Sequence, residues 1–435
     1  MSPVLIGLLG VAVLVAMFFS RAPIAYVMAM VGFCGFALVR GLEPALKLLA
    51  RDYYGVFSSY GLTIVPLFIL MGQIAFNAGI SRRLYDSAYK LVGSYRGGLA
   101  TATVLACCAF GAVCGSSPAT AATMATVGLP EMRRYGYHPR LATGVVASGG
   151  GLGMLVPPSV VLLVYGILTE QSIGALFVAA LIPSVIVSLM FVLTVALVCA
   201  RRPQLGPAGE KSDWPTRVRS LGNLSETLAV FALVMGGLFT GLFTPTEAGG
   251  VGAAGMLITA WARRLLPWAK LVKSLVESLR TSCMVLMLVA GAVIFGHFLA
   301  VTGIPMAAAA WVRGLAWPGW AVMGLIVAIY LLGGCFIDAL ALIMLTIPIF
   351  HPVVMGLGYD PIWFGVIIVL VTQMGVITPP VGINAYVVHG VDLRTPLEEI
   401  FRGSLPFLWA LVLATALFIA WPELITWLPQ LMRGA

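Results

Sequence analysis

Two diproline steps interrupt apolar segments of this chain and are suited to bind a cation. Residues 153–158 read GMLVPP and residues 375–380 read GVITPP, with Pro379 lying 222 positions after Pro157 (379 minus 157). Proline has no backbone N–H and removes one hydrogen bond from a helix. We therefore expect each step to free two carbonyl groups, those of Gly153 and Met154 and those of Gly375 and Val376. In lipid such groups need a partner within the protein; Na⁺ is one candidate, and a kink repaired by neighbouring groups is the alternative.

Hydroxyl groups accompany both diproline steps and would complete a Na⁺ site. Ser116, Ser117 and Thr120 belong to a GSSPAT turn inside an apolar run, Ser159 follows the first step, and Thr378 precedes the second. A serine or threonine can also bond to the carbonyl one helical turn earlier. For Ser117 and Thr120 both interpretations stay open.

Three other polar residues have candidate roles. Asp338 is the carboxylate of the apolar stretch 318–350, and an acid at membrane depth is a functional candidate. Asn384 follows the second diproline step and either contacts a substrate or ion site or joins two packed helices. Glu247 follows Thr244-Pro245-Thr246 and either complements the dipole at a helix start or makes a contact within a scaffold.

The composition indicates a membrane protein. Of the 435 residues, 60% are hydrophobic and 9% are charged, and the mean hydropathy is +1.03; both values are typical of multi-span chains. The net charge of +9 is expected to encode topology, not nucleic-acid binding. The sequence contains no GxxxxGK[ST] loop and no HExxH, and residues 115–119 only approach GxSxG. We therefore expect neither ATP hydrolysis nor enzymatic activity.

Apolar segments predict ten spans and two re-entrant hairpins. The spans are expected at about 4–20, 23–39, 59–80, 141–164, 173–199, 228–244, 246–262, 281–300, 362–385 and 403–421. The stretches 99–130 and 318–350 are too long for one span and too short for two, and each contains a break. We interpret them as helical hairpins whose tips are buried in protein or line a watery cavity.

The basic residues predict the orientation of these spans. If the N-terminus lies outside and both hairpins return to the side from which they enter, most of the 25 lysines and arginines lie in inside loops. This asymmetry is the one that the positive-inside rule demands. A full crossing by either hairpin would divide the basic loops between the two sides.

The two halves of the chain repeat one pattern. Pro23 matches Pro245 and Pro183 matches Pro406 at nearly the offset of the diproline steps. The predicted units are scaffold helices at 1–58, a first hairpin and interrupted helix within 59–199, a cytoplasmic linker at 200–223, scaffold helices at 224–280, a second hairpin and interrupted helix within 281–421, and a tail at 422–435. Because the copies would cross the membrane in opposite directions, we predict an all-α membrane protein of two inverted-topology repeats. Secondary transporters have this architecture, with a site near the midplane.

Five motifs together resemble the large membrane subunit of tripartite ATP-independent periplasmic (TRAP) transporters. They are GSSPAT at 115–120, PPS at 157–159, FTPTEA at 243–248, Gly333 with Phe336 and Asp338, and TPPVGIN at 378–384. The similarity covers essentially the whole chain. It implies an elevator-type, Na⁺-driven importer of organic acids in the bacterial inner membrane, with a periplasmic N-terminus and no use of ATP.

The resemblance also implies partners and site residues. The partners are a small four-helix membrane subunit and a periplasmic substrate-binding protein, and the substrate is a carboxylate. The first Na⁺ site would use Ser116, Ser117, Gly153 and Pro157, and the second would use Gly333, Asp338, Gly375 and Thr378. Substrate contacts are expected from Thr120, Pro158, Ser159, Pro380 and Asn384.

Two other functions stay open at this stage. A stand-alone Na⁺/carboxylate symporter of related fold would take its substrate directly from solution. A channel would show flux that is independent of any Na⁺ gradient. Uptake by the reconstituted chain, with and without a binding protein, separates these functions from a three-part importer.

Overall fold

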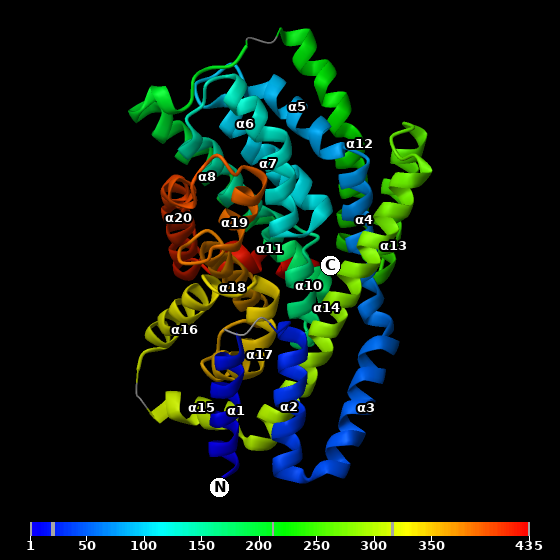
Figure 1. Ribbon diagram of the computed structural model, residues 1–435, viewed down its shortest axis with the longest axis vertical. Coiled ribbons are helices and arrows are strands. Elements are labelled where there is room, and N and C mark those ends of the chain that lie inside the picture. Colours follow the sequence, from blue (N-terminus) through cyan, green and yellow to red (C-terminus); the bar gives the residue numbers. More distant parts are fainter. Residues whose placement is uncertain (1, 19–21, 211–212, 315–316, 434–435) are drawn as a thin grey trace.

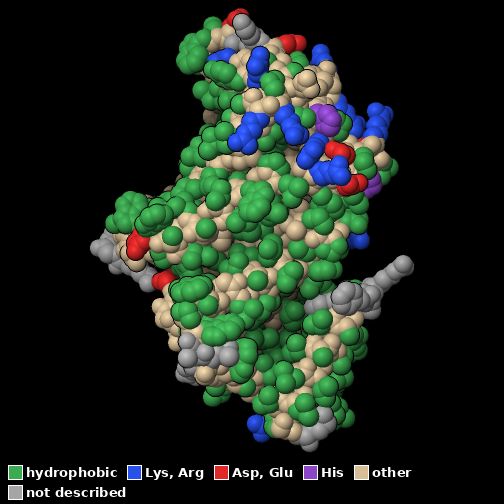
Figure 2. Space-filling view, turned by 90° about the vertical axis from the view of Figure 1, so that its left-hand side faces the viewer, with side chains coloured by type: hydrophobic (Ala, Val, Ile, Leu, Met, Phe, Trp, Pro, Cys, Tyr) green, Lys and Arg blue, Asp and Glu red, His purple; other side chains and the backbone are tan. Residues whose placement is uncertain are grey.

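The computed structural model describes residues 2–18, 22–210, 213–314 and 317–433. Within these residues the chain forms helices joined by short loops, and the helices make an elongated body (Figure 1). Figure 2 shows a broad apolar surface across the middle of one face, with Lys and Arg side chains gathered towards one end. The predicted all-α membrane fold is confirmed.

The first half of the chain contains two 3₁₀ turns and eleven helices in the described residues. The helices are α1 (Pro3–Phe18), α2 (Ile24–Arg40), α3 (Leu42–Ser58), α4 (Ile64–Asn77), α5 (Ile80–Val92), α6 (Gly98–Cys114), α7 (Ser117–Arg134), α8 (Pro139–Gly150), α9 (Leu152–Leu155), α10 (Val160–Leu168) and α11 (Ile173–Arg201). The turns η1 (Tyr60–Thr63) and η2 (Pro203–Leu205) precede α4 and follow α11.

The second half repeats this order of elements with two fusions. Its helices are α12 (Trp214–Phe239), α13 (Pro245–Ala262), α14 (Trp268–Thr302), α15 (Ile304–Gly314), α16 (Gly319–Gly334), α17 (Ala339–Gly356), α18 (Pro361–Gly375), α19 (Ile383–Val391), α20 (Leu397–Ala420) and α21 (Glu423–Arg433). In this order, the single helix α14 corresponds to α3, η1 and α4 of the first half. The single helix α18 corresponds to α8 and α9. The extra helix α21 follows α20 and is the last one in the described residues.

Length and composition alone allow fewer crossings than the ten predicted spans. Five helical segments in the described residues pass this test, and seven pass if two bent pairs each count as one span. Three predicted spans correspond to the shorter apolar helices α1, α2 and α18. One arm of the second predicted hairpin, α17, is among the five, because its 18 residues have a mean hydropathy of 2.0 and include no Asp, Glu, Lys or Arg.

Several helices lie outside the predicted apolar spans. Helix α5 buries Ile80, Leu84 and Tyr85 on one face and has Arg82 exposed on another, so its average hydropathy is too low for a span. Helix α14 begins at Trp268, well before the predicted span at 281–300, and α12 begins at Trp214, within the predicted linker at 200–223. These differences correct the predicted boundaries: charged residues continue these helices beyond their apolar parts.

The arrangement of helices places the two hairpins in different halves of the molecule. Helices α6 and α7 lie in the upper half of Figure 1, and α16 and α17 lie in the lower half. Helix α14 packs along α2 and α4, while α20 packs along α8, and α7 packs against α8 and α19. Trp363 links α18 to α20: its buried Nε1–H donates to the carbonyl of Phe418 at 2.9 Å.

Candidate functional site

The tip of the first hairpin rests on the break in the first interrupted helix. Gly115 ends α6 with a φ of +63°, Ser116 is extended, and α7 starts at Ser117. Helix α9 ends at Leu155 and α10 begins at Val160, which brackets the first diproline step. The N–H of Val160 donates to the carbonyl of Gly115 at 3.4 Å. We call this contact region the first junction.

Close approach at the first junction requires glycine at position 153. A Cβ atom on Gly153 would lie 2.3 Å from Oγ1 of Thr120 and 2.6 Å from the carbonyl oxygen of Ser116. Real Cβ atoms do not approach other atoms so closely, so alanine there would push the tip away. The fold thus brings Ser116, Thr120 and Gly153 together at this junction.

The second hairpin and the second interrupted helix meet in the same way. Helix α18 ends at Gly375 and α19 begins at Ile383. A Cβ atom on Gly375 would lie 2.5 Å from the backbone of Gly334. The N–H groups of Val381 and Gly382 both donate to the carbonyl of Cys335 at 3.2 Å. In this second junction, as in the first, the broken helix donates to a carbonyl at a hairpin tip.

The predicted free carbonyl groups mostly have partners, so this expectation is wrong for three of the four. The hydroxyl of Ser159 donates to the carbonyl of Met154. The carbonyl of Gly375 accepts from the N–H of Thr378 at 3.0 Å, and that of Val376 accepts from the N–H of Asn384 at 3.0 Å. Loop residues replace the hydrogen bonds that proline removes. Each carbonyl oxygen has a second lone pair, so such oxygens can still face a cation.

The threonine hydroxyls at the junctions bond to the helix that carries them. Oγ1 of Thr120 donates to the carbonyl of Ser116 at 2.8 Å, and Oγ1 of Thr378 donates to the carbonyl of Met374 at 2.7 Å. Of the two interpretations of Thr120, the hydrogen bond to the carbonyl one helical turn earlier is therefore present. A hydroxyl that donates its proton retains oxygen lone pairs, and this orientation turns them away from the accepting carbonyl.

Asn384 joins the two halves of the chain. Its side chain is fully buried; Nδ2 donates to the carbonyl of Ala147 and to Oγ of Ser117, each at 2.9 Å, and Oδ1 accepts from Oγ of Ser117 at 3.0 Å. Asn384 thus makes the helix-packing contact that was one of its two interpretations. Glu247 likewise has a local partner, because it forms a capping box with Thr244 at the start of α13.

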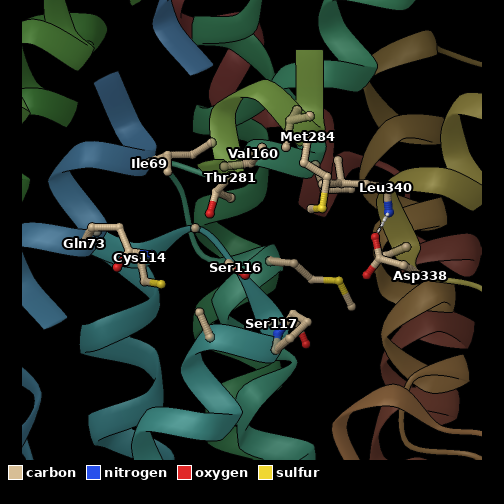
Figure 3. A pocket seen from close by; sticks show the side chains of 18 of the residues that line it. Ile69, Gln73, Cys114, Ser116, Ser117, Val160, Thr281, Met284, Asp338 and Leu340 are labelled. Carbon is tan, nitrogen blue, oxygen red and sulfur yellow. Dashed lines mark hydrogen bonds between the residues drawn. The ribbon is translucent and has the colours of Figure 1, made fainter. Parts of the chain in front are cut away.

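A cavity of about 320 Å³ lies where the two hairpin tips approach each other. It is bounded by the first tip, the start of α17, and helices α4 and α14 (Figure 3). Among the described residues that line it, the polar side chains are Gln73, Ser116, Ser117, Thr281 and Asp338, and none is Lys, Arg or His. The remaining lining is largely apolar, which is typical of a small-molecule site.

Asp338 caps α17, the second arm of the second hairpin, and faces this cavity. Its Oδ2 accepts from the N–H of Leu340 at 3.1 Å, which places Asp338 at the N-cap of α17. Figure 3 shows the carboxylate across the cavity from Ser116 and Ser117. Gly333, Gly375 and Thr378, which the resemblance groups with Asp338, do not line the cavity.

The predicted substrate contacts lie outside the cavity lining. Thr120, Pro158, Ser159, Pro380 and Asn384 are absent from it. Pro158 and Ser159 are buried at the first junction, whereas Pro380 is exposed and lines a separate groove with Glu398 and Arg402.

Gln73 and Thr281 also line the cavity, although neither was predicted as a site residue. Gln73 carried a usable signal, since it is an isolated amide within an apolar run. Thr281 carried none, because it stands at the polar edge of its apolar segment.

Comparison with known proteins places the chain in a family. Residues 11–424 match the family described as tripartite ATP-independent periplasmic transporter, DctM component. The chain is 36% identical to the C4-dicarboxylate TRAP transporter large permease protein DctM of Pseudomonas aeruginosa, over 86% of this chain and 87% of that protein. It is 30% identical to the sialic acid TRAP transporter large permease protein SiaM of Vibrio cholerae, over 96% of each chain. The isethionate TRAP transporter permease protein DctMQ of Oleidesulfovibrio alaskensis is 32% identical, over 95% of this chain and 67% of that protein.

Solved structures of similar shape support the fold alone. The YdaH transporter of Alcanivorax borkumensis superposes with a TM-score of 0.62 at 17% identity, over 88% of this chain and 90% of that one. MtrF of Neisseria gonorrhoeae superposes with a TM-score of 0.55 at 16% identity, over 89% and 85%. The matched family, which spans nearly the whole chain, agrees with the motifs found in the sequence. The chain belongs to the tripartite ATP-independent periplasmic transporters, in which it is a DctM component, a multi-pass membrane protein.

Proposed function

We propose that this chain imports a small organic acid that a periplasmic binding protein delivers, and that Na⁺ drives the import. The observation that carries the proposal is the cavity between two hairpin tips, each of which rests on a broken helix. Discontinuous helices at membrane depth are the places where secondary transporters bind substrates and coupling ions. The names of the relatives, which include dicarboxylate, sialic acid and isethionate transporters, agree with an acidic substrate.

The two junctions are the proposed Na⁺ sites. The first would use Ser116, Ser117, Gly153 and Pro157, and its support is the packing of Gly153 against the carbonyl of Ser116 and the hydroxyl of Thr120. The second would use Gly333, Gly375 and Thr378. Backbone carbonyl and hydroxyl oxygens are suitable ligands for a hard monovalent cation, and unwound helices present such carbonyls. Asp338, which the resemblance groups with the second site, faces the cavity.

The substrate carboxylate would bind at the start of α7. The side chain of Ser116 makes no capping hydrogen bond to this helix, so the first N–H groups of α7 retain capacity for an acceptor. The helix dipole adds partial positive charge at this end. A Na⁺ at the first junction would lie beside the same tip and would increase its attraction for an anion, which couples the two binding events.

Transport is proposed to proceed by an elevator movement in the bacterial inner membrane, with the N-terminus in the periplasm. The two hairpins and the two interrupted helices would move together, and α2, α4, α13 and α14 would belong to the static part. Two features support this division: the order of elements recurs in the two halves, and the cavity lies at the boundary with α4 and α14. The inverted arrangement of the halves is supported by the separation of the hairpins in Figure 1.

Two protein partners complete the proposed transporter. A periplasmic binding protein would capture the solute, and a small four-helix membrane subunit would extend the static part. The exposed apolar surface in Figure 2 is suited to lipid and to such a subunit.

Uptake by reconstituted protein tests this proposal. This chain and its small subunit are placed in liposomes without ATP, and labelled solute is offered with its binding protein. We expect uptake only when an inward Na⁺ gradient and the binding protein are both present. Efficient uptake by the chain without the binding protein would instead identify a stand-alone symporter, and flux without a Na⁺ gradient would identify a channel.

A proline variant tests the first junction within the same assay. Pro157→Ala restores one N–H where the helix is interrupted between Leu155 and Val160, and we expect a straighter helix that no longer fits the hairpin tip. Transport should fall at least tenfold. Pro183→Ala is a suitable control, because Pro183 lies within the continuous helix α11. Full activity of Pro157→Ala would show that the break is a structural kink without a role in transport.

A further inference from the structure

We propose that the solute carried by this chain is a zwitterion, and that Asp338 binds its cationic group. This inference rests on the function proposed above and specifies the class of organic acid. Asp338 contributes the one acidic side chain to the described lining of the cavity, and no basic side chain is present there to neutralise it. A solute that bears a carboxylate and an ammonium or quaternary ammonium group supplies the missing positive charge itself.

The two hairpin tips offer opposite charges to the cavity. At the first tip, the N-terminus of α7 has no side-chain cap and presents partial positive charge. At the second tip, the N-terminus of α17 is capped by the carboxylate of Asp338, which replaces partial positive charge with a full negative charge. A zwitterion can satisfy both tips at once, whereas a dicarboxylate would place one of its anionic groups beside Asp338.

The surroundings of Asp338 favour an organic cation over a metal ion. Its neighbours in the cavity lining include Met284, Val285, Ala339 and Leu340, which supply no side-chain oxygen. Hard cations prefer several oxygen ligands, and no cluster of three or more His, Cys, Asp or Glu side chains suited to a metal occurs in the described residues. Methylene and methyl groups attached to a charged nitrogen, in contrast, pack well against such apolar side chains.

Asp338 is the residue of the predicted second Na⁺ site that lines the cavity, where Val376, the chain neighbour of Gly375, accompanies it. Asp338 lines the cavity, whereas Gly333, Gly375 and Thr378 do not. Thr281, on helix α14, also lines the cavity, and Figure 3 shows it nearer to Ile69 and Val160 than to Asp338. A volume of about 320 Å³ lies at the small end of ligand sites, so the solute is small.

Isosteric competitors test the inference on the unmodified protein. In the reconstituted three-part transporter, glycine betaine is compared with 3,3-dimethylbutanoate, and 5-aminovalerate is compared with hexanoate; each anion has carbon in place of the charged nitrogen. Succinate represents the dicarboxylates. The solute used for uptake is the one that stabilises the cognate binding protein in a thermal-shift screen. We expect that solute to be zwitterionic and at least one zwitterion to compete tenfold better than its isosteric anion.

A matched pair of variants then tests Asp338. Asp338→Asn removes the charge and keeps an oxygen that can cap α17. Asp360→Asn does the same at the N-cap of α18, where Asp360 accepts from the N–H groups of Ile362 and Trp363 and lies outside the cavity lining. For Asp338→Asn we expect the solute KM to rise at least tenfold while the Na⁺ concentration for half-maximal uptake stays unchanged. Asp360→Asn should resemble the wild type.

Several outcomes would overturn the inference while leaving Na⁺-driven import intact. They are a cognate solute without a cationic group, competition by succinate as strong as that by the zwitterions, and an Asp338→Asn variant with an unchanged KM. A raised Na⁺ requirement with an unchanged KM would assign Asp338 to the second Na⁺ site instead. If Asp338→Asn does not fold, the competition series on the wild type decides the matter alone. Loss of the dependence on Na⁺ or on the binding protein would instead contradict the proposed function.

Discussion

Ser117 and Asn384, which are 267 positions apart, exchange hydrogen bonds of 2.9 and 3.0 Å in the buried centre of the protein. Ser117 starts the second arm of the first hairpin, and Asn384 lies in the first turn of α19. The contact therefore links the first hairpin tip to the helix that follows the second diproline step. A movement of one half without the other would have to break it.

Removal of the Asn384 amide should loosen this link. We expect Asn384→Ala to lower the free energy of unfolding by about 1–3 kcal/mol, because it leaves the carbonyl of Ala147 and the hydroxyl of Ser117 without this partner. Thermal unfolding in detergent measures the effect. Asn77→Ala is the matched control, since the Asn77 amide donates to Glu277 and to the carbonyl of Gln73 in a partly buried contact. This variant should lose less unfolding free energy than Asn384→Ala. Equal losses in the two variants would contradict a special role for Asn384.

Alanine at Gly153 should disturb the first junction specifically. The added Cβ would lie 2.3 Å from Oγ1 of Thr120, and overpacking of this kind costs about 1–3 kcal/mol. Since the displaced tip would hold the first Na⁺, we expect the Na⁺ concentration for half-maximal uptake to rise about tenfold. Gly250→Ala is the control, because a Cβ at this helical position meets nothing within 4 Å. An unchanged Na⁺ dependence in Gly153→Ala would exclude this junction as a Na⁺ site.

The pair formed by Asp52 and His297 should stabilise the contact between α3 and α14. Oδ2 of Asp52 lies 2.7 Å from Nδ1 of His297, and the side chain of Asp52 is only 6% exposed. His297→Ala leaves this carboxylate buried without its partner, so we expect a loss of about 2–4 kcal/mol in unfolding free energy. The double variant Asp52→Asn/His297→Ala should recover part of it.

An exposed pair provides the comparison for this measurement. Lys47 and Glu43 form an ion pair in which both side chains are largely exposed, and Lys47→Ala should cost about 0.5 kcal/mol or less. A His297→Ala variant no less stable than Lys47→Ala would show that the Asp52 contact contributes little.

Asp392 should make stability depend on pH in the acidic range. Burial acts to raise the pKa of Asp392, but hydrogen bonds from Thr395 and Arg133 and the charge of Arg133 hold this pKa below its ordinary value. A carboxyl with a lower pKa in the folded state stabilises the protein above the unfolded-state pKa of about 4 and loses this effect as pH falls through the folded-state pKa. Asp392→Asn should therefore be less stable than the wild type at neutral pH, and the difference should shrink below about pH 4.

The pH profile needs a control variant that loses a carboxylate elsewhere and leaves the loop of Asp392 unchanged. Glu43→Gln removes a carboxylate that is largely exposed and pairs with Lys47, so its stability should follow that of the wild type at each pH. Thermal unfolding between pH 3 and 7 measures all three proteins. A constant difference between Asp392→Asn and the wild type across this range would show that the ion pair with Arg133 is not the cause.

Much of the architecture could be predicted because apolar segments and proline act locally. An apolar run of sufficient length must lie in lipid or in the core, and proline ends or bends a helix wherever it falls. Helix α9 ends and α10 begins around the first diproline step for this reason, and the hairpin arms turn at Gly115, where only glycine adopts a φ of +63° readily. Amphipathic helices such as α5 were missed, because their stability comes from packing of one face and not from average hydropathy.

The residues of the cavity could be predicted only in part, because contacts between distant segments decide them. Ser116, Ser117 and Asp338 carried a signal in their own polarity within apolar runs, and all three line the cavity. Asn384 carried the same signal but is used for packing between the two halves. The free carbonyls predicted from proline chemistry acquired partners from loop residues such as Ser159, which no helix rule specifies.

The amino-acid sequence alone determined the membrane class, the repeated order of elements and the family, since these follow from local composition and from motifs with fixed spacing. Only the tertiary structure decided which polar groups share one cavity and which satisfy each other. The physical reason is that a hydroxyl or carboxylate at membrane depth takes whatever partner the packing brings within about 3 Å. Asp338 faces a cavity whose described lining contains no basic side chain, whereas Asn384 lies outside that lining, although both are polar residues that follow the break of a helix.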